Sequence, residues 1–289
     1  MPAASKPRVL LIANRSRPEV AAMIDSVDHL VRGHATIAGE IDADDGPLPN
    51  HPQADLAVAL GGDGTMLSQA RRLAGWRIPL VGVNFGRLGV LAEFDMDSLR
   101  RHATVVFGPQ PPIHEHLILE VEVLDAQGGV LASEKAINDC VVTAGPPYRM
   151  IELEISINGN DGPTLTGDGV IVATPIGSTA YNVSAGGPIV QPTLDAIIIT
   201  PIAAHSLAFR PIVVGTGGGI EVQVVRANAG TTLVIDGQAL VPLRKGQRIR
   251  VRRDGDRARF VANPSSTYWQ ILLQKMRWAA PPTYRDRGA

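Results

Sequence analysis

The sequence contains almost no cysteine, no long apolar run and no excess of one charge. Cys140 is the only cysteine in 289 residues, which excludes an internal disulfide and favours a reducing compartment such as the cytoplasm. No apolar stretch approaches the roughly 18 residues that cross a bilayer. A net charge of −1 gives no indication of a nucleic-acid partner or an anionic membrane surface. We therefore expect a cytoplasmic protein that binds neither nucleic acid nor membrane.

The first hundred residues alternate between strand and helix patterns. Short apolar runs at 9–13, 55–60 and 78–83 are typical of buried strands. The run at 9–13 is too brief for a secretion signal. Helical spacing of apolar residues follows the first two runs, and a short helix is expected at 97–102. This alternation predicts an α/β domain with a parallel sheet over residues 1–107.

The pattern changes at the proline-rich stretch 108–112, where apolar residues begin to alternate with period two. Residues 151–157 alternate clearly, and Asn158-Gly159 follows as a hairpin turn. Further short runs, with 248–252 and 259–262 as separate strands, predict a β-rich domain over 108–264. Residues 265–276 return to a helical pattern, and 277–289 form a charged, proline-containing tail that we expect to be disordered.

The stretch that organises these expectations is Ala57–Thr65, AVALGGDGT. A buried strand ends in Gly61, Gly62 and Gly64, which lack the Cβ atoms that would block a tight turn. A helix follows at once, so backbone N–H groups and the helix dipole together favour an anion there. The sequence predicts a phosphate site, although it has neither the lysine of a Walker A loop nor the G-x-G-x-x-G spacing.

Asp63 places a carboxylate inside this predicted anion site. It could hold a magnesium ion, or accept the proton of a hydroxyl that attacks a phosphoryl group. A purely structural alternative is that Asp63 caps the following helix, because Asp is a frequent N-cap residue. The residues of this stretch alone leave both interpretations open.

Three stretches resemble known kinases. GGDGT after a strand resembles the phosphate-site motif of NAD kinases, diacylglycerol-type lipid kinases and phosphofructokinases. The stretches 81–89, VGVNFGRLG, and 166–188, TGDGVIVATPIGSTAY followed by SAGGP, are similar to NAD kinases in particular. The resemblance runs with gaps from about Asp55 to Lys275. It implies a phosphofructokinase-like and diacylglycerol-kinase-like α/β domain, a β-rich NAD-binding domain, and a terminal helix (265–276) that packs back on the first domain.

The resemblance also implies roles for particular residues. Asp63 matches the family's proton acceptor, which activates the 2′-hydroxyl of the adenosine ribose of NAD. The residues implied to bind ATP or NAD are Gly61, Gly62, Gly64, Thr65, Ser68, Asn138, Asp139, Arg149, Asp168, Thr179, Ala180, Tyr181, Ser184 and Gln238. No protein metal ligand is assigned.

Some of these assignments have structural alternatives. Asn138-Asp139 falls where the family has Asn-Glu, so its second carboxylate is one methylene shorter, and the pair could be an ordinary strand-end turn. Arg149 could be an ordinary surface arginine. Gln238 follows Asp236-Gly237, which is first of all typical of a hairpin turn. The segment around Thr179 could serve only to cap a helix.

The resemblance implies an NAD kinase that transfers a phosphoryl group from ATP to NAD with Mg²⁺, giving NADP; polyphosphate remains open as a second donor. Family members are commonly dimers or tetramers, so a homodimer or homotetramer is expected. A lipid kinase would need an apolar slot or a basic membrane face, which the polar segment 177–184 does not offer. A non-catalytic NAD-binding regulator is disfavoured by the intact GGDGT.

Overall fold

The computed structural model describes residues 6–44, 46, 48, 53–85, 89–206 and 208–276. The chain forms two compact units. The first contains residues 1–72, 78–114 and 260–289, and the second contains residues 73–77 and 115–259. Within the described residues, no helix is long and apolar enough to cross a membrane. The predicted tail, 277–289, lies outside the described residues.

The first unit is built on a parallel sheet, as the alternating pattern predicts. Its strands are β1 (Arg8–Ala13), β2 (Thr36–Ile41), β3 (Leu56–Leu60) and β4 (Leu80–Val83), in the order β2-β1-β3-β4. Its helices are α1 (Pro18–Ala21), α2 (Ile24–His34), α3 (Asp63–Leu73), α4 (Met96–Val106) and α6 (Tyr268–Met276). Every residue of β3 and β4 is buried, which explains why these strands read as continuous apolar runs.

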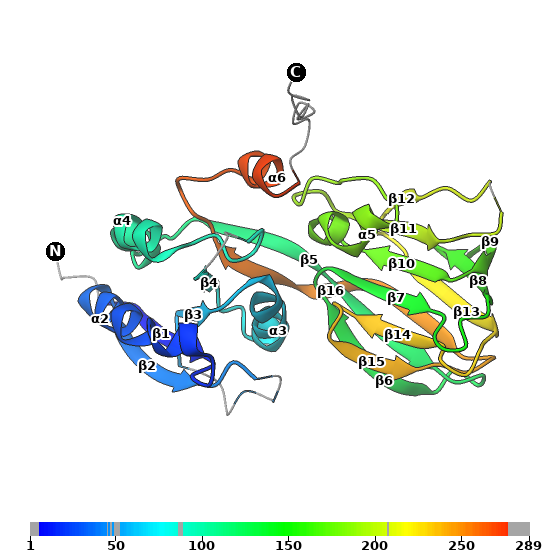
Figure 1. Cartoon of the computed structure of the whole chain (residues 1–289), viewed down its shortest axis with the longest axis horizontal. Helices are drawn as coiled ribbons and strands as arrows, with labels where there is room; N and C mark the ends of the chain where they lie inside the picture. The colour runs from blue at the N-terminus through cyan, green and yellow to red at the C-terminus, as the bar shows by residue number, and fades with distance from the viewer. Residues whose placement is uncertain are drawn as a thin grey trace, which may run out of the picture. The chain divides into compact units, whose positions relative to one another are not determined.

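Helices lie on both faces of this sheet. Val27 of α2 and Leu99 of α4 belong to one apolar core together with Val81 and Val83 of β4. Gly82 lies between those two valines and therefore faces the other side. A Cβ on Gly82 would come within 2.7 Å of the sulfur of Met66, so α3 packs on that opposite face. The motif-bearing helix α3 is thus separated from α2 and α4 by the strands of the sheet (Figure 1).

The second unit is a stack of two sheets. Its strands are β5 (Ile113–Leu124), β6 (Val130–Ala136), β7 (Asp139–Thr143), β8 (Ile151–Ile157), β9 (Asn160–Gly167), β10 (Gly169–Ala173), β11 (Ala196–Ile202), β12 (Ile212–Gly215), β13 (Ile220–Arg226), β14 (Thr232–Ile235), β15 (Ala239–Pro242) and β16 (Arg248–Val261). One sheet has the strand order β12-β11-β10-β7-β14-β15. In the other sheet the order β16-β13-β8-β9 is extended by β5, which pairs with β16, and by β6, which pairs with β5. Short helical turns occur at η1 (Ala74–Trp76), η2 (Ile176–Thr179) and α5 (Tyr181–Ser184).

Both sheets contribute to one apolar core. Leu153 and Val222 come from one sheet, and Val142 and Val172 from the other. This core explains the period-two alternation, because inward positions are apolar and outward positions meet solvent. The predicted turn at Asn158-Gly159 joins β8 to β9, with φ angles of 54° and 76°. The predicted fold class, a parallel α/β domain followed by a β-rich domain, is confirmed.

Two predicted boundaries differ from the structure. Residues 248–252 and 259–262 were expected as separate strands around Asp254-Gly255, but β16 runs without interruption from Arg248 to Val261. Asp254 is buried and paired with Lys135 of β6 at 2.7 Å, so its carboxylate is satisfied within the sheet rather than at a turn. The terminal helix begins at Tyr268 rather than 265, because Thr267 and Gln270 exchange capping hydrogen bonds.

Candidate active site

The glycine turn after β3 connects the strand directly to α3. The φ angle of Gly61 is 155°, and a Cβ there would overlap the side chain of Thr65. A larger residue would therefore have to displace the first turn of the helix. The amide of Gly61 donates to the carbonyl of Val83 on the neighbouring strand at 2.9 Å. The turn is thus anchored to β4, and α3 begins at Asp63.

The Asp63 carboxylate is held by the loop that follows β4. Its oxygens accept hydrogen bonds from the backbone N–H groups of Val90 at 3.0 Å and of Leu91 and Ala92 at 3.1 Å. A Cβ on Gly89 would overlap the Asp63 carboxylate, so the backbone approaches closely at a position where only glycine fits. These contacts fix the orientation of Asp63 by a loop 27 to 29 residues further along the chain.

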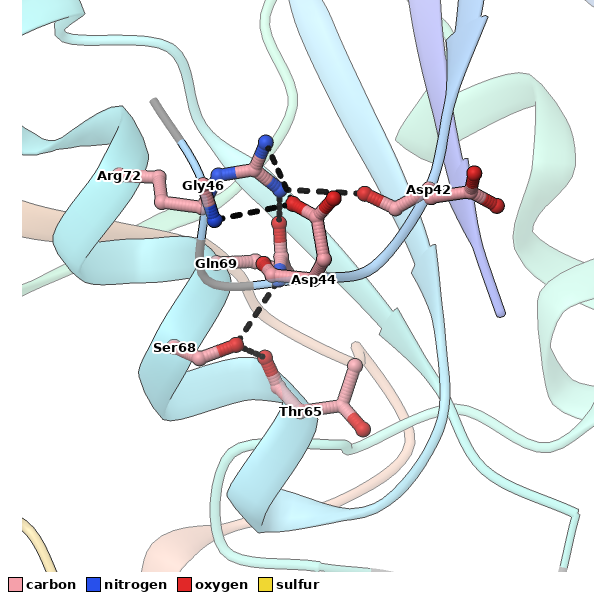
Figure 2. Close-up of polar contacts among 7 residues, drawn as sticks. All are labelled: Asp42, Asp44, Gly46, Thr65, Ser68, Gln69 and Arg72. Carbon is pink, nitrogen blue, oxygen red and sulfur yellow. Dashed lines mark hydrogen bonds and ion pairs between the residues drawn. The ribbon is translucent and has the colours of Figure 1, made fainter. Parts of the chain in front are cut away.

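Helix α3 also contacts Asp42 and Asp44, which follow β2 (Figure 2). The Gln69 amide donates to the carbonyl of Asp44 at 3.0 Å and to the hydroxyl of Ser68 at 2.8 Å. Arg72 donates to the carbonyl of Asp42 at 3.2 Å and pairs with the Asp44 carboxylate at 3.3 Å. Ser68, an expected nucleotide contact, is buried and hydrogen-bonded to Gln69 in this network. The network anchors the helix that carries Asp63.

A cavity of about 320 Å³ lies in the second unit, where β7 and β14 meet the segment before α5. It brings together four of the expected NAD-binding residues, Asn138, Asp139, Ala180 and Tyr181. The other lining residues are Val141, Thr143, Val234, Asp236 and Gly237. The lining therefore combines amide, carboxylate and hydroxyl groups with the apolar side chains of two valines and an alanine, and a mixture of polar and apolar groups is typical of small-molecule sites.

Asp139 has the most perturbed carboxylate of this cavity. It is only 4% exposed, and burial raises its pKa to about 7, with a further contribution from the negative charge of Asp236. The backbone N–H of Tyr181 bonds to the carboxylate and opposes that rise. Burial also raises the pKa of the neighbouring Cys140 thiol. Perturbed carboxylates in a cavity are characteristic of functional sites.

The remaining expected residues do not line this cavity. Arg149 is exposed in the loop before β8, with its carbonyl bound by Asn228. Asp168 is exposed between β9 and β10. The Thr179 hydroxyl donates to the carbonyl of Ile176 at 3.2 Å, and neither η2 nor α5 has a side-chain cap hydrogen bond, so the capping alternative does not describe this segment. Ser184 and Gln238 are both exposed, and Gln238 closes the β14–β15 turn by donating to Ile235 at 2.8 Å.

Three residues that contact the site were missed by the sequence reasoning. Asp236 was considered only as part of a turn, but its carboxylate is directed back at the Asn138-Asp139 backbone. Thr174 lies within the long second signature but had no assigned role, and it bonds to the same backbone. Gly89 is the last residue of the stretch VGVNFGRLG, and its close contact with Asp63 explains why this position needs a glycine.

The two units define a class of protein. In the first unit a strand, a glycine turn and a helix N-terminus follow one another, an arrangement that favours anions, and the carboxylate of Asp63 is fixed beside the turn. The second unit offers a cavity with convergent amide and carboxylate groups. A glycine turn at a helix N-terminus with a fixed carboxylate is a feature of nucleotide-dependent phosphotransferases.

Comparisons with known proteins identify the family. The family described as ATP-NAD kinase N-terminal domain matches residues 48–110, and the ATP-NAD kinase C-terminal domain matches residues 137–263. The NAD kinase of Magnetococcus marinus is 41% identical over 225 residues, which cover 78% of this chain and 74% of that protein. The NAD kinase of Symbiobacterium thermophilum is 34% identical over 280 residues, covering 93% and 99%. The chain belongs to the NAD kinase family.

Solved structures agree with this assignment at the level of the fold. Yeast NADH kinase complexed with NADH has a TM-score of 0.84 at 22% identity, and the match covers 99% of this chain and 91% of that one. An NAD kinase from Archaeoglobus fulgidus in complex with ATP has a TM-score of 0.74 at 26% identity, covering 93% and 98%. The α/β and β-rich units of the present chain are therefore those of the NAD kinase fold.

Proposed function

We propose that the protein transfers the terminal phosphoryl group of ATP to the 2′-hydroxyl of the adenosine ribose of NAD. The bond from the ribose oxygen to the terminal phosphorus forms, the bond from that phosphorus to the bridging oxygen of ATP breaks, and ADP leaves with NADP as product. The observation that carries the proposal is the position of the Asp63 carboxylate. Asp63 follows the glycines at the end of β3, and three backbone N–H groups of the loop after β4 fix its carboxylate. The chain also belongs to the NAD kinase family.

In this proposal Asp63 accepts the proton of the attacking hydroxyl. Phosphoryl transfer depends chiefly on positioning and on electrostatic stabilisation, because the transition state is loose and carries dispersed negative charge. A carboxylate whose orientation is fixed before the substrate arrives meets the positioning requirement. Gly61, Gly62, Gly64 and Thr65 hold the phosphates, since backbone N–H groups at a helix N-terminus favour anions.

Asn138 and Asp139 bind ribose hydroxyls of NAD, with Ala180 and Tyr181 forming the wall of the same cavity. Carboxylate and amide oxygens accept hydrogen bonds from hydroxyls, and a tyrosine ring offers a flat surface for a purine or nicotinamide. Arg149, Asp168, Thr179, Ser184, Ser68 and Gln238 stay in the proposal as further nucleotide contacts, on the family resemblance alone.

Magnesium would enter with ATP. Mg²⁺ typically keeps several waters and binds substrate phosphates with few protein ligands, so no residue of the chain is assigned to it. Within the described ranges, no group of three or more His, Cys, Asp or Glu side chains is arranged to hold a metal ion. When bound, the ion would shield the charge of the donor phosphates.

The test is to incubate the purified protein with ATP, Mg²⁺ and either NAD or NADH, and to separate the nucleotides by chromatography. We expect NADP or NADPH and an equal amount of ADP. Polyphosphate in place of ATP tests the second donor. ATP consumed without a 2′-phosphorylated nucleotide would contradict the proposal, and NAD binding without turnover would favour a regulator.

Two further parts of the proposal rest on the family and the composition. A dimer or tetramer is expected from the family, and light scattering on the eluting peak of a size-exclusion column measures it. Activity in the cytoplasm fits the single, buried cysteine. Fractionation of cells that express the protein tests this location.

A further inference from the structure

Asp236 lies far from Asn138 and Asp139 in the sequence but binds their backbone directly. It follows β14 in a left-handed turn, with φ angles of 48° at Asp236 and 68° at Gly237, and it is 8% exposed. Its Oδ1 accepts from the N–H groups of Asn138 at 2.7 Å and Asp139 at 3.1 Å, and its Oδ2 accepts from that of Ile137 at 3.0 Å. Its own N–H donates to the carbonyl of Asp139 at 2.9 Å.

Thr174, which follows β10, binds the other side of the same backbone. Its hydroxyl donates to the carbonyl of Ile137 at 2.6 Å, and its N–H donates to the carbonyl of Asn138 at 2.9 Å. The hydroxyl in turn accepts from the N–H of Gly177 at 3.1 Å. Gly177 packs so closely that a Cβ would overlap the Asn138 carbonyl. Thr174 is fully buried, so these bonds are shielded from water.

Together the two residues satisfy all six backbone polar groups of residues 137–139. Asp236 holds the three N–H groups and one carbonyl, and Thr174 holds the other two carbonyls. The backbone of residues 137–139 is therefore held on both sides. The side chains of Asn138 and Asp139 have only their own torsions left to adjust in the cavity.

The arrangement carries an electrostatic cost that a purely structural corner would not need. Two carboxylates, Asp139 and Asp236, are buried next to one another, and this contributes to the raised pKa of Asp139. A neutral acceptor such as Asn at 236 would avoid the repulsion but would direct an NH₂ group, rather than a second acceptor oxygen, at the N–H groups. A buried pair of carboxylates with a perturbed pKa beside a cavity is characteristic of functional sites.

We propose that Asp236 and Thr174 are positioning residues for NAD, holding the 137–139 backbone so that Asn138 and Asp139 present their side chains to the ribose. Neither needs to touch the ligand through its own side chain. The inference rests on the proposed function, because it requires that Asn138 and Asp139 bind NAD. Under this inference, the affinity for NAD depends on the Asp236 carboxylate, which lies 97 to 99 positions along the chain from the residues that it binds.

The test compares Asp236→Asn with Asp254→Asn. Asp254 is an equally buried aspartate of the same unit, 8% exposed, and its carboxylate binds Lys135 and the N–H of Asp256. We expect Asp236→Asn to weaken the Kd for NAD about 10- to 100-fold, as loss of bonds to a charged group implies. Asp254→Asn should change it less than about threefold, even where the two variants lose similar Tm.

The pH at which the Kd for NAD changes is a second measurement, and a general loss of stability would not alter it. The groups that act on the Asp139 carboxylate are Asp236 from the β14–β15 turn and the N–H of Tyr181; Cys140, the next residue of the strand, lies in the apolar core, where burial raises the pKa of its thiol. In the wild type we expect NAD affinity to change near pH 7, as Asp139 ionises. Removing the charge of Asp236 should shift this change to lower pH, whereas Asp254→Asn should leave it in place.

Thr174 provides a second route if Asp236→Asn does not fold. Thr174→Val keeps the shape but removes the hydroxyl, and we expect a 5- to 50-fold weaker NAD Kd; Thr174→Ser keeps the hydroxyl and should retain the wild-type value within about threefold. Wild-type NAD affinity in both Asp236→Asn and Thr174→Val would overturn this inference alone. A wild-type protein that neither binds NAD nor forms NADP would overturn the proposed function and this inference with it.

Discussion

Gly89 lies directly against the carboxylate of Asp63, so closely that a Cβ on Gly89 would overlap it. The three following N–H groups bind the same carboxylate. The residue expected to accept the proton is therefore oriented by a neighbouring loop whose backbone can approach only because position 89 has no side chain. This relationship connects two motifs of the sequence and leads to the first prediction.

We expect Gly89→Ala to lower kcat by about 100-fold or more, because a misplacement of about 1 Å in a catalytic group costs that much. The KM for ATP should change little. Gly33→Ala is the control, since Gly33 lies in α2 with open space where the Cβ would be; it should keep full activity. Steady-state kinetics of both variants give the answer. A fully active Gly89→Ala would show that the position of Asp63 does not depend on this contact.

Asp63→Asn should keep the fold and much of the NAD affinity but lose catalysis. Removing a general base typically costs about 10²- to 10⁴-fold, or roughly 3–5 kcal/mol of barrier. The amide occupies the same space beside Gly89 and keeps one acceptor oxygen, but its NH₂ group faces at least one N–H of residues 90–92, so Tm should fall by several degrees while the fold is kept. The measurement is kcat alongside Tm and the Kd for NAD. Turnover near the wild-type rate would exclude Asp63 as the base.

Asp139→Asn should weaken NAD binding by about 1–3 kcal/mol, as expected for losing hydrogen bonds to a charged acceptor. The KM for ATP serves as the internal control. Asp139→Glu restores the family's residue and should be milder if the cavity of about 320 Å³ leaves room for one more methylene. Unchanged NAD affinity in Asp139→Asn would return the Asn138-Asp139 pair to an ordinary strand-end turn.

The same substitution should change the pH dependence of stability. Because the pKa of Asp139 rises from 3.8 to about 7 on folding, the folded state binds more protons between these values. The free energy of unfolding contributed by this group therefore falls as pH rises from about 4 to 7, by at most about 4 kcal/mol at 1.36 per unit. Urea unfolding at pH 5 and pH 8 measures it. Relative to wild type, Asp139→Asn should gain stability at pH 8; an equal difference at both pH values would contradict this.

The terminal helix α6 offers a matched pair of adjacent leucines. Leu272 is 2% exposed, whereas Leu273 is 48% exposed. Leu272→Ala should lower the free energy of unfolding by about 2–4 kcal/mol, since it leaves a cavity in a packed region. Leu273→Ala should cost less than about 1 kcal/mol. Denaturant unfolding of both variants tests whether the helix is docked, and equal losses would argue against it.

The local parts of the fold follow from the sequence because their causes are local. The strand before Gly61, the turn that needs glycine, and the helix after it are adjacent in the chain. The alternation at 151–157 and the left-handed turn at Asn158-Gly159 likewise depend on neighbours. Where a distant partner intervenes, the prediction fails: Asp254-Gly255 was expected to interrupt the strands, but pairing with Lys135 keeps β16 continuous.

The sequence by itself determined the fold class, the glycine turn with Asp63 in it, and the resemblance to NAD kinases, since each depends on contiguous residues. Only the tertiary structure decided which groups hold the functional side chains in place. The contact of Gly89 with Asp63 and the bonds from Asp236 and Thr174 to residues 137–139 connect segments up to 99 positions apart. Such bonds leave no period or spacing in the sequence, because they arise only when separate strands are brought side by side.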